Sequence, residues 1–198
     1  MDEAAYVIRR YRIPYNSSVN NKGLIFLCVI LLVVITIGIW QRRHGVYLTN
    51  IGDITLSSTA FTENQPIPKS FTCDGDAGHP PLSIDNVPSA TKSLVITLDD
   101  PDAPGKTFHH WVVWNIPSSV KQIPAAVLPL GSVEGTNSAG RYGYIGPCPP
   151  SGTHRYIFTL TALNTTLDLP ATAKSDDVEA AMKNHILART NLTGSYSR

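Results

Sequence analysis

Hydrophobic and polar positions follow different patterns in the two parts of this chain. Leu24 to Trp40 forms an uncharged apolar run of 17 residues. From Ile54 onward, short segments rich in Val, Ile, Thr and aromatic residues alternate with Pro, Gly, Asp and Asn, which predicts short strands separated by turns. We expect strands at Ile54–Leu56, Ser93–Leu98, Trp111–Ile116 and Tyr156–Leu163. This spacing is typical of a mainly β fold, an antiparallel two-sheet sandwich.

A helix is predicted near the end of the chain. Ser175 is a suitable N-cap, acidic residues follow it, and Arg189 lies near the opposite end, as the helix dipole favours. One stripe of this helix carries Val178, Ala181, Met182, His185 and Ile186. We therefore expect a C-terminal helix that packs on the sandwich, with His185 as a partly covered residue of the helix face.

The apolar run at 24–40 predicts one transmembrane helix. A helix of this length rises about 25 Å, enough for a thin bilayer core. A buried helix and a cleaved signal peptide are the alternatives, but the run ends in Trp-Gln-Arg-Arg rather than in small residues. Four Lys/Arg precede the run and two follow it closely, which favours an exported C-terminal domain. The expected organisation is a polar tail (1–23), a single-pass membrane helix (24–40), a linker (41–53) and one domain (54–198).

Composition narrows the class of partner. Residues 45–198 contain ten Lys/Arg and thirteen Asp/Glu, a net charge of −3. A mildly acidic domain without a basic stripe argues against nucleic acid as a partner.

Two stretches gather the residues that carry chemistry. Leu98 to Pro117 holds Asp100 and Asp102 beside a Pro/Gly turn, with His109 and His110 on the next predicted strand. Since neighbouring side chains of a strand point to opposite faces, only one of these two histidines can face a given pocket. The second stretch, Tyr144 to Leu160, runs from a Gly/Pro-rich loop into a strand.

On that second strand, alternation puts His154 and Tyr156 on one face and Arg155 on the other. The histidines lack the spacing of a metal site, so we expect no metal and no cofactor. Cys73 and Cys148 can form a disulfide in an exported domain, which would stabilise it by up to about 4 kcal/mol, or remain loop thiols.

The segments DDPDAP, HHWVVWNIP and GPCPPSGTHRY follow one another along the chain, and FTCDGD, PPLS, NSAGRYGY and TTLDLP accompany them. In this order the three segments resemble the phosphatidylethanolamine-binding protein (PEBP) family, in particular its bacterial and archaeal Raf-kinase-inhibitor-like branch, and the other four strengthen the match. The resemblance covers roughly Ile54 to Arg198 and leaves the apolar run outside. It implies a large β-sheet packed on a smaller one, with short helices, and a small pocket for phosphate-like anions or phospholipid head groups.

Carried onto this chain residue by residue, the resemblance implies a defined pocket. Its ligand-binding residues would be Asp100, His110, Gly146, Cys148, Pro149, Pro150, His154 and Tyr156. The imidazole N–H groups, the tyrosine hydroxyl and loop N–H groups would be donors to the anion. Asp100 would fix the tautomer of a histidine or accept from an ammonium or hydroxyl group of the ligand. Asp102 and Arg155 would form a supporting ion pair. Ile84, Ala139 and His79 depart from the residues common in the family and leave the ligand's identity open.

Two functions follow from these residues. The first is a membrane-anchored binding protein with a small anion pocket. Members of the family also inhibit kinases or proteases, so a protein target is compatible with the resemblance, although no feature of the sequence names one. The alternative is a hydrolase that uses the Asp/His site on a small ester or phosphoester. It lacks a Gly-x-Ser-x-Gly elbow, and Cys148 is its only candidate for a covalent nucleophile, so we expect a binding protein rather than an enzyme.

Overall fold

The structure is a computed structural model and describes residues 53–76 and 78–198. The predicted tail, the membrane helix at 24–40 and all of the predicted linker except Asp53 lie outside these residues. Among the residues that are described, no helix is long and apolar enough to cross a membrane.

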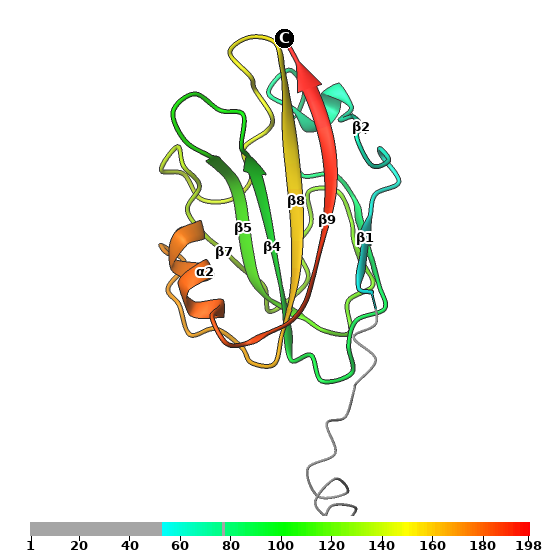
Figure 1. Ribbon diagram of the computed structural model, residues 1–198, viewed down its shortest axis with the longest axis vertical. Coiled ribbons are helices and arrows are strands. Elements are labelled where there is room, and N and C mark those ends of the chain that lie inside the picture. Colours follow the sequence, from blue (N-terminus) through cyan, green and yellow to red (C-terminus); the bar gives the residue numbers. More distant parts are fainter. Residues whose placement is uncertain (1–52, 77) are drawn as a thin grey trace, which may run out of the picture. The chain divides into compact units, whose positions relative to one another are not determined.

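Two β-sheets form the body of the domain (Figure 1), which confirms the predicted mainly β, two-sheet class. The larger sheet has six strands in the order β2-β9-β8-β4-β5-β7, and the smaller has three in the order β1-β3-β6. The strands are β1 (Thr55–Ser57), β2 (Gln65–Pro66), β3 (Leu82–Asp85), β4 (Ser93–Asp100), β5 (Phe108–Pro117), β6 (Gln122–Ile123), β7 (Val133–Glu134), β8 (Thr153–Leu163) and β9 (Ile186–Ser197). Among the paired strands, β2 and β9 run parallel, and the other pairs are antiparallel as predicted.

The large sheet is buried on both faces by different layers. One face packs against the small sheet, through β4 residues such as Leu94 and Leu98 and through Ile84 of β3. The other face packs against α2 (Ser175–Met182), where Trp114 and Val178 are fully buried. Strand β4 therefore lies between two hydrophobic layers, which explains its nearly continuous apolar sequence.

The C-terminal part of the chain differs from the prediction. Helix α2 ends at Met182, and the chain closes with the twelve-residue strand β9, which pairs with β8 along its length. A helix extended through His185 and Ile186 would gain only a short apolar stripe. The strand gains backbone hydrogen bonds to β8 along its whole length, so the strand is favoured. Asn184 turns the chain with a φ of 69°, and Nδ1 of His185 lies 2.9 Å from Oδ1 of Asn164 in that turn.

The start of α2 also differs by one residue. Ser175 is the first helical residue, and Lys174 is the N-cap. The carboxylate of Asp177 accepts a hydrogen bond from the backbone N–H of Lys174 at 2.9 Å, which satisfies one donor near the helix start. Val178 and Met182 are buried against the sheet, so the predicted packing of the helix is correct. The described residues contain one further helical turn, the 3-10 helix η1 (Lys69–Phe71).

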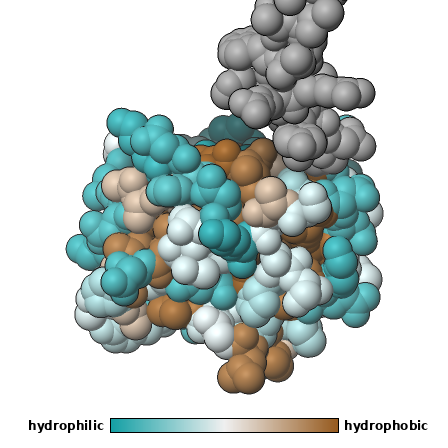
Figure 2. Space-filling model, turned by 90° about the horizontal axis from the view of Figure 1, so that it is seen from below, coloured by the Kyte–Doolittle hydropathy of each residue, from teal (hydrophilic) through white to brown (hydrophobic). Residues whose placement is uncertain are grey.

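The two ends of the large sheet differ in the residues and loops that lie there. In Figure 1, β4 ends and β8 begins at the upper end of the large sheet, where the loops before β5 and β8 also lie. Figure 2 shows the domain from below, and in this view hydrophobic residues (brown) are interspersed with hydrophilic ones (teal and white). Asp100 and His154 lie at this upper end.

Candidate ligand-binding site

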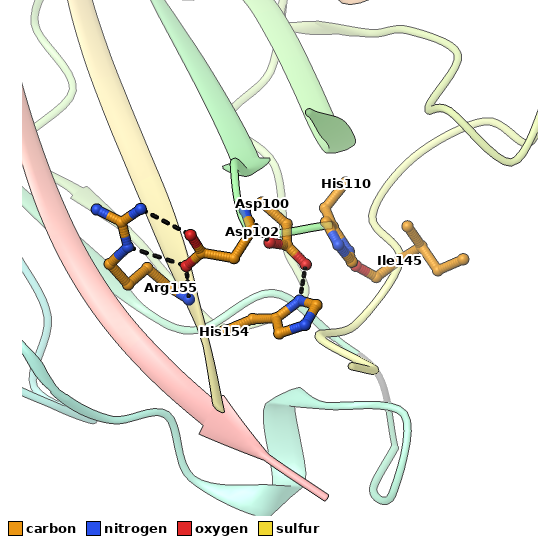
Figure 3. A network of polar contacts seen from close by, with 6 residues as sticks. All are labelled: Asp100, Asp102, His110, Ile145, His154 and Arg155. Carbon is orange, nitrogen blue, oxygen red and sulfur yellow. Dashed lines mark hydrogen bonds and ion pairs between the residues drawn. The ribbon is translucent and has the colours of Figure 1, made fainter. Parts of the chain in front are cut away.

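Asp100 and His154 meet at the upper end of the large sheet. Asp100 is the last residue of β4, and His154 is near the start of the adjacent antiparallel strand β8. Oδ2 of Asp100 lies 2.7 Å from Nδ1 of His154, and both side chains are buried (Figure 3). The other oxygen, Oδ1, accepts a hydrogen bond from the backbone N–H of Asp102 at 2.9 Å. The carboxylate therefore orients the imidazole while the turn orients the carboxylate.

A β-bulge brings His110 to the same site. Leu98 pairs with Trp111 and Asp99 pairs with His109, so His110 is the extra residue on β5. An extra residue shifts the alternation of side chains by one. As a result His110 and Trp111 both lie on the face of Tyr156, and the rings of His110 and Tyr156 are 5.3 Å apart. His109 lies on the opposite face, where it bonds to Asp99.

The proton positions on the two site histidines follow from their partners. Nδ1 of His110 lies 2.8 Å from the carbonyl oxygen of Ile145, and Nδ1 of His154 faces the Asp100 carboxylate. A carbonyl and a carboxylate only accept, so each Nδ1 carries the proton and donates. Nε2 is then an acceptor in a neutral ring and a donor in a protonated ring, so the predicted N–H donation to a ligand requires the protonated ring.

Burial also affects the charge of the site. It lowers the pKa of His110 below its ordinary value, although the carbonyl of Ile145 and the nearby carboxylates oppose this shift. His110 is therefore neutral at pH 7 in the unliganded protein. An anion placed beside it would favour the protonated ring.

Tyr156 supplies a buried donor with no partner. Its side chain is fully buried, and its hydroxyl has no hydrogen-bond partner within the described part of the chain. The Asp100 carboxylate and the Cys148 backbone lie near, but neither makes a hydrogen bond of good geometry. Burial, with the Asp100 charge, raises the pKa of Tyr156, so the hydroxyl stays protonated. Buried polar groups are usually paired, and an unpaired O–H of this kind suits a ligand acceptor.

The loop from Gly146 to Pro150 packs against the residues that follow η1 and is bonded to them. Gly146 packs so tightly that a Cβ would lie 2.6 Å from the backbone carbon of Thr72. The N–H of Cys73 donates to the carbonyl of Pro147 at 3.1 Å, and Cys73 and Cys148 form a disulfide with their Cα atoms 5.4 Å apart. Of the two prolines that follow, Pro149 is buried and Pro150 is exposed. Because its sulfur is bonded to Cys73, Cys148 is not a free thiol.

Asp102 and Arg155 form an ion pair beside the site. Nε and Nη2 of Arg155 donate to the two carboxylate oxygens of Asp102 at 2.9 and 2.7 Å. The backbone N–H of Arg155 donates to the same carboxylate, so the turn after β4 is tied to β8. These hydrogen bonds lower the pKa of Asp102 to about 2. Arg155 points away from His154, as strand alternation predicts (Figure 3).

Some features of the site were not predicted. The bulge at His110 and the bond to Ile145 depend on strand register, which the residue pattern alone does not reveal. The pairing of Asp99 with His109, at 2.6 Å between Oδ1 and Nδ1, was also missed. The doublets Asp99-Asp100 and His109-His110 were its signal, since adjacent residues on paired strands place one acid and one imidazole on each face. The described residues contain no cluster of three or more His, Cys, Asp or Glu side chains that could hold a metal ion.

Comparison with known proteins agrees with this fold. The sequence pattern of the family described as phosphatidylethanolamine-binding protein matches residues 57–197. A UPF0098 protein of Methanothermobacter thermautotrophicus is 49% identical over 150 residues, which cover 73% of this chain and 99% of the relative. A UPF0098 protein of Aquifex aeolicus is 44% identical over 148 residues, which cover 71% of this chain and 86% of the relative.

Two solved structures are similar as well. A PEBP homologue from Chlamydia trachomatis superposes with a TM-score of 0.72 at 36% identity, covering 74% of this chain and 99% of that one. Escherichia coli YbcL, described as a member of the mammalian PEBP family, superposes with a TM-score of 0.70 at 30% identity, covering 74% and 99%. The fold and the polar end of the sheet define a PEBP-type domain. The chain belongs to the phosphatidylethanolamine-binding protein family, and it is similar to archaeal and bacterial members of that family.

Proposed function

We propose that this protein is a binding protein whose pocket, at the upper end of the large sheet, receives a phosphate-like group such as a phospholipid head group. The observation that carries the proposal is the Tyr156 hydroxyl, a buried donor without a partner in the described part of the chain, beside two oriented histidines. A phosphate oxygen would satisfy this hydroxyl. A phosphate dianion would favour protonation of His110 and accept from its Nε2–H, and the ammonium of an ethanolamine head group would donate to an unprotonated Nε2.

Binding is supported over catalysis by the state of Cys148. A covalent mechanism would need a free nucleophile beside the histidines. The sulfur of Cys148, the one candidate that the sequence suggested, is bonded to Cys73. The Asp100–His154 pair then serves to orient an imidazole toward a ligand. We accordingly propose that the protein is not an enzyme.

The disulfide also supports an extracytoplasmic location for the domain. Disulfides persist in oxidising compartments, outside the cytoplasm. We propose that residues 24–40 anchor the chain in a membrane as a single-pass helix and that the domain lies on the extracytoplasmic side. Alkaline extraction of membranes from cells that produce the full chain tests the anchor. The full chain should stay in the membrane pellet, and a variant without residues 24–40 should move to the soluble fraction; a full chain that is extracted would contradict the anchor.

The pocket is tested by calorimetric titration of the full-length chain in detergent with O-phosphorylethanolamine. His154→Ala removes the imidazole that Asp100 orients, and we expect at least about tenfold weaker binding, because hydrogen bonds to charged groups contribute about 1.5–3 kcal/mol. His185→Ala is a matched control, since His185 lies in the turn after α2 and contacts Asn164. Equal affinity in the wild type and in His154→Ala would reject the proposed pocket.

A further inference from the structure

A polar cavity of about 470 Å³ lies on the other face of the large sheet, on the side of α2. His109 of β5 lines it together with Lys106 of the preceding turn, the loop that contains Ser138, and the first residues of α2. Figure 1 shows α2 beside β5 and β7, where this cavity lies. The Asp100–His154 site is on the face that packs against the small sheet, so the two sites are separated by the sheet itself.

His109 is held in one orientation in this cavity. Thr97 donates its hydroxyl to Oδ2 of Asp99 at 3.0 Å, and Oδ1 of Asp99 lies 2.6 Å from Nδ1 of His109. Nδ1 therefore carries a proton and donates to the carboxylate. The opposite ring nitrogen, Nε2, is turned toward the cavity, 3.6 Å from a carboxylate oxygen of Asp176, which also lines it. The ring thus presents one polar atom of fixed position to any occupant.

Hydrogen bonds within the protein hold the side of the cavity next to His109 in place. The N–H of Ser138 donates to the carbonyl of His109, and the N–H of His109 donates to the Ser138 hydroxyl, both at 2.9 Å. Asn137 is buried, its side-chain oxygen accepts from the N–H groups of Ala139 and Arg141, and its amide donates to the carbonyl of Gly143. A preformed wall of this kind lowers the ordering cost of binding.

The charges of the cavity favour an anion. Lys106 and Lys174 both line it, and among the described residues neither ammonium group has a carboxylate within 4.0 Å. Of the nearby carboxylates, Asp99 is engaged by His109, Asp177 accepts from the backbone N–H of Lys174, and the side chain of Asp176 is 92% exposed. Two cations without a carboxylate partner among the described residues therefore line the same cavity, where an oxyanion could contact both.

The rest of the lining selects a hydrophilic molecule. Hydroxyl groups are contributed by Thr107, Thr136, Ser138 and Ser175, and no large apolar side chain is among the described residues that line the cavity. Polar surface exceeds apolar surface in the lining, which favours a hydrophilic ligand over an acyl chain or an aromatic one. The volume exceeds what a single phosphate ion fills, so an occupant should carry hydroxyl groups of its own as well as an anionic group.

From the cavity, its two unpaired lysines and the oriented His109, we propose a second ligand site for a hydrophilic small molecule that carries an oxyanion. A sugar phosphate is the class that fits, with its phosphate between Lys106 and Lys174 and its hydroxyls at the polar walls and Nε2 of His109. The site is independent of the phosphate-group pocket proposed above.

The full-length chain in detergent tests this proposal by NMR titration with glucose 6-phosphate, inorganic phosphate and glucose as separate probes. The imidazole of His109 and the amide of Ser138 report on the cavity. We expect a saturable shift with glucose 6-phosphate, weaker binding of phosphate, and no binding of glucose. The double variant Lys106→Gln/Lys174→Gln should lose at least about tenfold in affinity for glucose 6-phosphate, since two charge-assisted contacts are removed.

The controls separate this site from the first. Lys92→Gln/Lys121→Gln changes two exposed lysines outside the cavity and should leave the affinity unchanged. His154→Ala should leave the His109 shifts in place, whatever it does at the other pocket. The proposal is overturned if His109 shows no saturable shift with glucose 6-phosphate, or if the shift keeps its affinity in Lys106→Gln/Lys174→Gln.

Discussion

His109 and His110 are neighbours in sequence, yet they face opposite sides of the large sheet. Nδ1 of His109 lies 2.6 Å from Asp99 on the side of α2, and Nδ1 of His110 lies 2.8 Å from the carbonyl of Ile145 on the side of the small sheet. The end of the β4–β5 pair therefore serves two separate polar sites, one on each face.

The Tyr156 hydroxyl can be removed without damage to the fold. Tyr156→Phe keeps the buried ring and deletes an O–H that has no partner in the described structure. We expect thermal stability to be unchanged or slightly higher, because an unsatisfied buried polar group is costly. The same variant should bind O-phosphorylethanolamine at least about tenfold more weakly, since it loses a hydrogen bond to a charged group.

Calorimetry and thermal unfolding of the same Tyr156→Phe samples check both halves of this prediction. Tyr142→Phe is the control, because Tyr142 is largely exposed. A large loss of stability in Tyr156→Phe would mean that its hydroxyl has a partner in the unliganded protein.

The Cys73–Cys148 bond should contribute strongly to stability. It links residues 75 positions apart, and the loss of a native disulfide from a small domain costs about 2–5 kcal/mol. Urea unfolding of Cys73→Ser/Cys148→Ser should show this decrease in the free energy of unfolding. Wild-type protein treated with a dithiol reductant should show a similar decrease, and an unchanged unfolding midpoint in both samples would show that the bond is absent from the folded protein.

His109 should make stability depend on pH with a defined sign. The hydrogen bond to Asp99 raises the pKa of His109, Asp176 adds to this effect, and Lys106 opposes it. The pKa of His109 is thus higher in the folded protein than in the unfolded chain, where it is about 6.5. The resulting contribution to the free energy of unfolding is fully present below pH 6.5 and is lost as the pH rises through the pKa of the folded protein. His109→Gln should therefore lower the melting temperature more at about pH 5.5 than at about pH 9.

Thermal melts of His109→Gln at the two pH values measure this difference directly. His185→Gln provides the comparison, since its ring contacts the neutral side chain of Asn164. A deficit of the same size at both pH values would contradict the assigned charge on His109.

Anion binding at the Asp100–His154 site should take up a proton. Burial lowers the pKa of His110, so this ring is neutral before binding, and a bound phosphate dianion would raise its pKa again. The affinity for the phosphate should then increase as the pH falls from about 8 toward 6. In this range His110 is protonated in the complex but still neutral in the free protein. Calorimetry in two buffers of different ionisation enthalpy measures the proton directly; a count of zero would argue against an imidazole at the anion.

Much of the fold was predictable from local residue patterns. The strands around β4, β5 and β8 follow from apolar segments between Pro, Gly and Asp, and Gly105 in the Asp-Pro-Asp-Ala-Pro-Gly turn adopts a φ of +86°. The opposite orientations of His154 and Arg155 follow from strand alternation.

Other features depend on contacts between distant segments. Strand β9 exists because it pairs with β8, and its sequence near Ile186 is equally compatible with a helical stripe. The bulge at His110 is set by the register between β4 and β5, and its bond to Ile145 requires the folded loop. Residue identity suggested which side chains form the site, while tertiary pairing decides which nitrogen of each histidine faces a ligand.

The proposed pocket is tested most directly by the imidazole nitrogens of His154 and His110. In the full-length chain labelled with ¹⁵N-histidine, Nδ1 of both rings should appear protonated before ligand is added, and Nε2 of His110 should appear as an acceptor. Saturation with O-phosphorylethanolamine should shift the Nε2 signals of these two rings toward the hydrogen-bonded or protonated state and leave His185 unchanged. Saturable binding that leaves the Nε2 signals of both His154 and His110 in place would contradict the account.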